Sequence, residues 1–79
     1  MSNRASIKLK NNSAKPMRLI VEPWATEFDL PSGSSCEVFS VGGMGIPAID
    51  LESVEGAMIF WINTDGAIYE YWQDGKLID

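Results

Sequence analysis

The amino-acid sequence predicts an all-β fold, either a small antiparallel sandwich or a partly open barrel of seven to eight short strands. Three observations favour this class. Apolar and polar residues alternate with a period of two in almost every segment, which is typical of half-buried strands. Turn-forming residues separate these segments at short intervals. Finally, we find no eleven-residue window with the apolar stripe and capping residues of a helix.

Four strands are expected in the N-terminal half. Each is bounded by turn chemistry: the cluster 11–16, the proline at position 23, and the Pro-Ser-Gly-Ser turn at 31–34. Proline 23 should end its strand because it has no backbone N–H to donate. The expected strands are 7–10, 17–22, a short one through Phe28 and Leu30, and 36–41.

In the C-terminal half, residues 42–47 form an irregular connection with three glycines and are a candidate crossover between sheets. Segment 57–63 is apolar on both faces and predicts a central strand covered on both sides. Asp65-Gly66 and Asp74-Gly75 are typical of type I′ hairpin turns. The other expected strands are 48–53, 67–72 and a short final one within 76–79.

The length of the chain predicts one domain, residues 1–79. Cys36 is the only cysteine, so no internal disulfide can form, and a single thiol favours a reducing compartment. We find neither an apolar run of signal-peptide type nor one near the ~20 residues that cross a bilayer. We therefore expect a cytoplasmic protein that does not contact membranes.

The charge distribution is uneven along the chain. The net charge of −5 disfavours binding to nucleic acid. Residues 1–18 carry five of the six cations and no acid, whereas residues 19–79 carry all eleven acids. One interpretation is a basic arm that grips an anion. The favoured interpretation is a basic strand whose charges pair with acidic neighbours inside the fold.

Few residues could carry catalysis. The chain has no histidine, which excludes histidine triads and histidine metal sites. Cys36 shares a strand face with Val38 and is expected to be a small buried side chain. Asp50 and Glu52 share a strand face, and Glu70 could come near them, but a solvated outer face is the favoured interpretation. We predict a protein that is not an enzyme and needs no cofactor or metal.

The glycine-rich segment 42–45 has the composition of a phosphate-binding loop. Such loops gain their affinity from a following helix, and here a proline and an alternating strand follow, with no lysine nearby. We expect a connection whose backbone requires positive φ angles.

The aromatic residues are the best candidates for a binding site, and we single out Trp24, Tyr69, Tyr71 and Trp72. Tyr69 and Tyr71 lie on one strand face, about 7 Å apart by strand rise. Such a pair can form a stacking platform for sugars or bases, or the anchor of a protein interface. The alternative is core packing, which we favour for Trp61 because its neighbours in the chain are apolar.

The stretch 11–41 carries a recognisable pattern. Glu22-Pro23-Trp24 is followed by Phe28-Asp29-Leu30-Pro31-Ser32-Gly33, with Asn12 and Ser13 before it. This pattern resembles a group of short bacterial all-β proteins that have no assigned activity. The resemblance implies a bacterial source and a β fold, and it transfers no catalytic or binding residue. Ala25 stands where the group has glycine, which leaves the geometry of that turn open. Judged from the residues alone, Glu22-Pro23-Trp24 is a structural corner or a ligand contact.

The sequence thus predicts a non-enzymatic interaction module that binds an unknown protein partner or associates with itself. Two alternatives stay open. One is a module that binds a small ligand or carbohydrate through surface aromatics. The other is an acidic inhibitor of a basic protein, such as an immunity-type protein.

Overall fold

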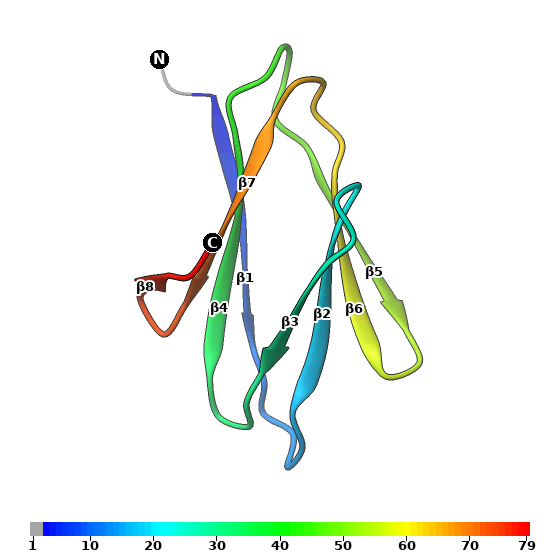
Figure 1. The fold of residues 1–79 in the computed structure, drawn as a ribbon, viewed down its shortest axis with the longest axis vertical. Coiled ribbons are helices and arrows are strands. Elements are labelled where there is room, and N and C mark those ends of the chain that lie inside the picture. The colour runs from blue at the N-terminus through cyan, green and yellow to red at the C-terminus, as the bar shows by residue number, and fades with distance from the viewer. Residues whose placement is uncertain (1–2) are drawn as a thin grey trace.

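The computed structural model describes residues 3–79, which form eight strands in two packed four-stranded sheets (Figure 1). Sheet A has the order β1-β4-β7-β8 and sheet B the order β3-β2-β6-β5. The sheets do not close into a barrel, and the predicted all-β sandwich is confirmed. The strands are β1 (Arg4–Lys10), β2 (Met17–Glu22), β3 (Thr26–Leu30), β4 (Ser35–Val41), β5 (Ile49–Val54), β6 (Ala57–Ile62), β7 (Ile68–Gln73) and β8 (Lys76–Leu77).

The chain changes sheet at four connections. The expected crossover around 42–47 is confirmed, because β4 lies in sheet A and β5 in sheet B. The expected hairpin at Asp65-Gly66 is wrong: β6 and β7 lie in different sheets, and only Gly66 of the two residues has a positive φ, whereas a type I′ turn needs both. Asp74 and Gly75 do have positive φ angles of 50° and 82° and join β7 to β8 as predicted.

Sheet B contains one parallel pair. The hairpins β2–β3 and β5–β6 are antiparallel, and they meet through β2 and β6, which run in the same direction. The antiparallel expectation therefore fails for this pair, while the other five pairings follow it. The parallel pair places the two most apolar strands at the centre of sheet B.

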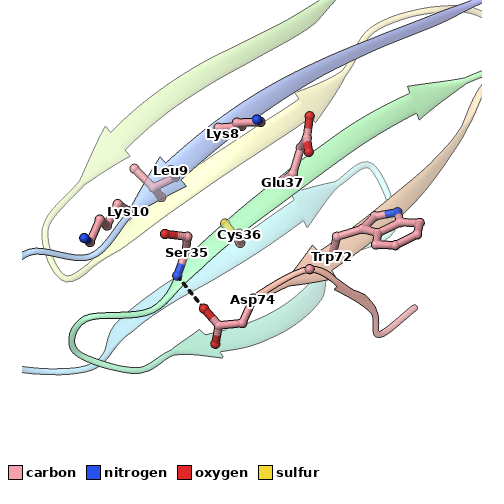
Figure 2. Close-up of a pocket in the computed structure, with 9 residues that line it drawn as sticks. Lys8, Leu9, Lys10, Ser35, Cys36, Glu37, Trp72 and Asp74 are labelled. Atoms are coloured by element: carbon pink, nitrogen blue, oxygen red, sulfur yellow. Dashed lines mark hydrogen bonds between the residues drawn. The ribbon is translucent and has the colours of Figure 1, made fainter.

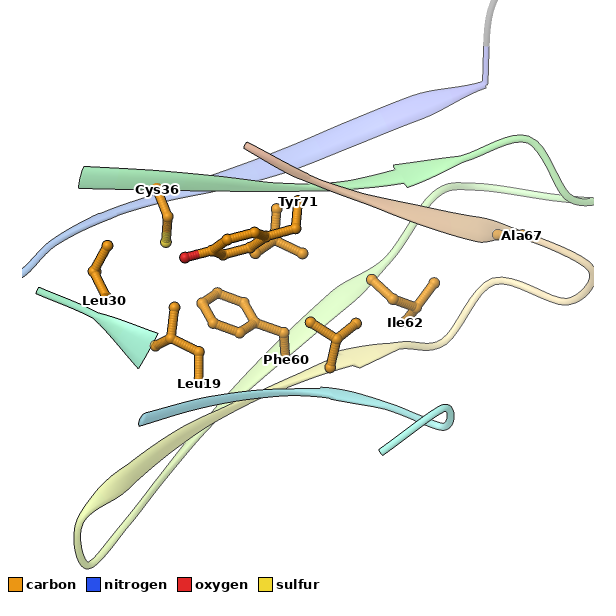
Figure 3. Close-up of a cluster of buried hydrophobic side chains, with 9 residues drawn as sticks. Leu19, Leu30, Cys36, Phe60, Ile62, Ala67 and Tyr71 are labelled. Atoms are coloured by element: carbon orange, nitrogen blue, oxygen red, sulfur yellow. The ribbon is translucent and has the colours of Figure 1, made fainter. Parts of the chain in front are cut away.

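The core lies between the two sheets and consists mainly of alternate residues of the central strands, with Leu30 of β3 and Ala67 added at its margins (Figure 3). Leu19 and Val21 of β2 are fully buried, while Arg18, which precedes Leu19 and lies on the opposite face of the strand, is exposed to solvent. Tyr71 reaches inward from β7 of sheet A and stacks on Phe28 of β3, with ring centroids 3.9 Å apart and planes 10° apart. Cys36 is buried in the same cluster, as expected.

β6 is central within sheet B, but the expectation that both of its faces are covered is wrong. A two-layer sandwich covers only the inner face of each sheet. Phe60 and Ile62 point into the core, and Trp61 lies on the opposite face, 36% exposed. Within residues 3–79 the structure contains no helix that could span a membrane.

The connections at the two ends of the sandwich are held by specific backbone contacts. Asn11 is fully buried, and its side chain donates hydrogen bonds to the carbonyl oxygens of Lys15 and Leu30. At the other end, Gly43 packs directly on the β6–β7 connection: a Cβ there would lie 2.6 Å from the Asp65 carbonyl oxygen. The positive φ angles expected within segment 42–45 are present at each of its glycines.

Candidate functional site

The predicted aromatic platform does not form, because Tyr71 is fully buried. Tyr69 and Tyr71 do share a face of β7, but that face is the inner one, directed at sheet B. Burial raises the pKa of the Tyr71 hydroxyl, which donates a hydrogen bond to Gln73 Oε1 at 2.8 Å. Tyr71 therefore belongs to the core, and the prediction of it as a contact residue is corrected.

Trp24 and Tyr69 meet at one edge of the sandwich. Their ring centroids are 4.9 Å apart, and Trp24 is 41% exposed. The Tyr69 hydroxyl donates a hydrogen bond to the Asp79 carboxylate; burial first, and this carboxylate second, raise the pKa of Tyr69. A shallow hollow of about 280 Å³ lies beside Trp24, with Asn63 and Asp65 among its lining residues.

Trp72 lies on the opposite face of β7 from the two tyrosines, on the outer surface of sheet A. It lines a groove of about 570 Å³ formed by β1, β4 and the β7–β8 turn (Figure 2). Lys8 and Lys10 form one wall and Glu37 lies in the middle. The four predicted residues thus occupy three separate places: the core, an edge and a groove.

The carboxylates of this groove accept hydrogen bonds within the protein, whereas its ammonium groups form no ion pair among the described residues. Glu37 accepts a hydrogen bond from the Ser6 hydroxyl at 2.6 Å, and Asp74 Oδ1 accepts one from the Ser35 backbone N–H at 3.0 Å. The ion pairs found within residues 3–79 are Arg4–Glu70 and Arg18–Glu27, so neither groove lysine takes part in one. Of the five cations in residues 1–18, the expected charge pairing is therefore confirmed for Arg4 and Arg18.

The outer surface of sheet B has a larger net charge than that of sheet A, and we call it the acidic face. It combines five carboxylates, one guanidinium and four apolar side chains, alternating with the core residues of β2, β3, β5 and β6. Its members are Arg18, Ile20, Glu22, Glu27, Asp29, Asp50, Glu52, Val54, Ile59 and Trp61.

Trp61 lies at the centre of this acidic face. In the sheet register it is opposite Glu22 on one side and Asp50 on the other. Its indole Nε1–H donates a hydrogen bond to Glu52 Oε1 at 2.9 Å, which holds the ring across β5 and β6. Ile20 and Ile59 are also opposite each other and extend the apolar centre. The result is an apolar strip with acidic residues on both sides.

The prediction that Trp61 packs in the core is wrong, because its side chain lies on the outer face of sheet B. The strand is apolar on both faces, so alternation alone does not say which face is covered. The useful indication lay in the neighbours, because β2 and β5 place acidic residues in register with Trp61. That indication requires the strand order, which the sequence does not reveal.

The candidate catalytic carboxylates do not come together. Asp50 and Glu52 are on the outer face of sheet B, whereas Glu70 is on the outer face of sheet A, where it binds Arg4. Among the described residues there is no cluster of three or more potential ligands for a metal. Burial raises the pKa of the Cys36 thiol to about 11, so this side chain remains protonated near neutral pH.

Comparisons with protein-family models, with curated proteins and with solved structures found no match to this chain. The resemblance of residues 11–41 to short bacterial proteins stays a prediction.

Proposed function

We propose that the protein is a non-enzymatic interaction module that binds a basic protein partner through the acidic face. The observation that carries this proposal is the exposed indole of Trp61 between Glu22 and Asp50. Tryptophan, with tyrosine and arginine, is enriched at the energetic centres of protein interfaces. An acidic surround selects for a partner that presents lysine or arginine.

The two kinds of group on this face have separate roles. The apolar strip of Ile20, Ile59 and Trp61 supplies area that a partner can bury. The carboxylates attract and orient a cationic partner, and their contribution falls as salt screens exposed charges beyond about 10 Å at 0.1 M. An acidic inhibitor of a basic protein is one form that such a module can take.

Binding of a basic amphipathic peptide tests this proposal. In a variant with Trp24→Phe and Trp72→Phe, Trp61 is the sole tryptophan, and its fluorescence reports the acidic face directly. We expect a lysine-rich amphipathic peptide to shift this emission, and expect the signal to weaken with salt. The same peptide with glutamate in place of lysine is the matched control and should not bind.

Two substitutions locate the contact in the otherwise unchanged protein. Trp61→Ala should weaken peptide binding roughly tenfold or more, the loss typical of an interface centre. Trp72→Ala removes the same ring type from the other surface and should leave binding unchanged. Equal binding of the acidic peptide, or full binding by Trp61→Ala, would contradict the proposal.

A second candidate function is suggested by the groove on sheet A. Its Trp72 ring offers a flat apolar wall, while the ammonium groups of Lys8 and Lys10 are its uncommitted polar groups. A planar aromatic anion has the matching chemistry. Titration with indole-3-carboxylate, and with neutral indole as the control, should then show anion-dependent shifts in NMR spectra. Glu37→Gln should strengthen this binding because it removes the opposing charge, and unchanged affinity in Lys8→Gln would contradict it.

A further inference from the structure

β5 is an edge strand whose outer side pairs with no other strand of residues 3–79. It follows β6 at the end of sheet B and forms the outermost strand on the right of Figure 1. An edge strand presents a row of N–H and C=O groups to which another strand can add. The edge of β5 therefore has the chemistry of a strand-binding site.

The register shows which backbone groups point outward. The Asn63 N–H donates to the Ala48 carbonyl oxygen at 3.1 Å, so these opposed residues form a hydrogen-bonded pair. In an antiparallel pair, hydrogen-bonded and non-hydrogen-bonded positions alternate. Ile49, Leu51 and Ser53 are therefore the residues whose N–H and C=O groups point away from β6.

The side chains of β5 also suit an added strand. Leu51 is on the side directed toward sheet A, opposite Phe60, yet it is 44% exposed. Its outward neighbours Asp50 and Glu52 are on the acidic face beside Trp61. A strand added here would cover Leu51 with one face and lie beside carboxylates with the other.

We propose that β5 binds an extended segment of the basic partner as an additional strand of sheet B, with apolar residues facing Leu51 and alternate lysines or arginines beside Asp50 and Glu52. This inference rests on the proposed function and names the form in which the partner is recognised. Main-chain hydrogen bonds supply the affinity in such strand addition, and alternate side chains supply the specificity.

Charge and packing argue against a second copy of this chain as the occupant. Two β5 edges side by side would bring Asp50 and Glu52 against the same carboxylates, which is unfavourable. β1 has the right alternation, because Lys8 and Lys10 alternate with Ile7 and Leu9, but both apolar side chains already pack against its own core. They cannot also cover Leu51 of another molecule.

Peptides of equal composition test the proposal. The probe is an eight-residue peptide of alternating lysine and valine with blocked ends, and its control has four lysines followed by four valines. We expect the alternating peptide to bind at least about tenfold more tightly, because only it can place lysine and valine on opposite faces of a strand. On binding, the amides of Leu51 and Ser53 should become protected from hydrogen exchange in the unmodified protein.

Ser53→Pro removes one outward N–H without removing a bond to β6, a substitution that edge strands tolerate. It should weaken the alternating peptide roughly tenfold, whereas Ser53→Ala should leave affinity unchanged. Full peptide affinity in Ser53→Pro, together with Leu51 and Ser53 amides that stay unprotected from exchange, would overturn strand addition. If only Trp61→Ala weakened peptide binding, the proposed function would still stand. Failure of both variants to alter binding would overturn both proposals. A dimer of the free protein in light scattering that Ser53→Pro abolishes would also overturn the assignment to a separate partner.

Discussion

Truncation of two adjacent aromatic residues distinguishes the inner from the outer face of β7. Tyr71 is fully buried, and replacing a buried aromatic ring by alanine costs about 3–5 kcal/mol. Its cost should reach the upper part of this range because Phe28 also loses a ring stacked at 3.9 Å. Trp72 is partly buried on the outer surface of sheet A, so Trp72→Ala loses most, but not all, of the ~1.5–3 kcal/mol that full burial contributes, roughly 2 kcal/mol.

Urea unfolding followed by far-UV circular dichroism measures both costs. A domain of this length has a total stability of about 4–12 kcal/mol and an m-value of roughly 1 kcal/mol per molar urea. Tyr71→Ala should therefore lower the midpoint by several molar or prevent folding, whereas Trp72→Ala should lower it by about 2 M. Tyr71→Leu, which keeps most of the apolar volume, supplies a measurable midpoint if the alanine variant does not fold. Equal costs at positions 71 and 72, or a larger cost for Trp72, would refute the inward orientation of Tyr71.

Three further predictions concern the backbone and the buried thiol. Gly43→Ala should cost at least about 2 kcal/mol more than Gly42→Ala in urea unfolding, because both glycines have positive φ but only a Cβ at Gly43 would strike the Asp65 carbonyl oxygen; equal costs would contradict this. Ala25→Gly should raise stability by about 0.5–1 kcal/mol, since Ala25 has a φ of 58°, and a drop in melting temperature would count against it. Burial raises the pKa of the Cys36 thiol from 9.0 to about 11. Above pH 9 the unfolded chain therefore releases a proton that the folded chain keeps, so the free energy of unfolding falls as the pH rises. At pH 10 this loss is roughly 1 kcal/mol. Cys36→Ala should flatten the dependence of the unfolding free energy on pH above pH 9. An unchanged dependence would contradict the burial of the Cys36 thiol.

The strands were predictable because local chemistry determines them. Alternation in segments such as 17–22 and 36–41, and the turn residues between segments, predict their positions closely. The sheet to which each strand belongs was harder to predict. Asp65-Gly66 forms a tight turn as expected, but local turn chemistry does not encode whether the next strand continues the same sheet or crosses to the other. The parallel pairing of β2 with β6 likewise depends on how two hairpins meet.

The candidate site could be predicted only in part, for a related reason. β7 carries aromatic residues on both faces, Tyr69 and Tyr71 on one and Trp72 on the other, so its pattern fits either orientation. β6 has the same ambiguity at Trp61. The neighbouring strands resolve it, since acidic residues of β2 and β5 lie in register with Trp61 while Phe28 stacks on Tyr71. These are long-range relations that composition and spacing do not contain.

The indole N–H resonances of the three tryptophans test the central claim most directly. Trp61 donates its N–H to Glu52 on the acidic face, and Trp72 donates to Glu70 on the other surface. In a titration of the ¹⁵N-labelled protein with the alternating lysine–valine peptide, we predict that the Trp61 indole signal moves while those of Trp24 and Trp72 stay in place. Movement of the Trp72 signal with a stationary Trp61 signal would contradict binding at the acidic face.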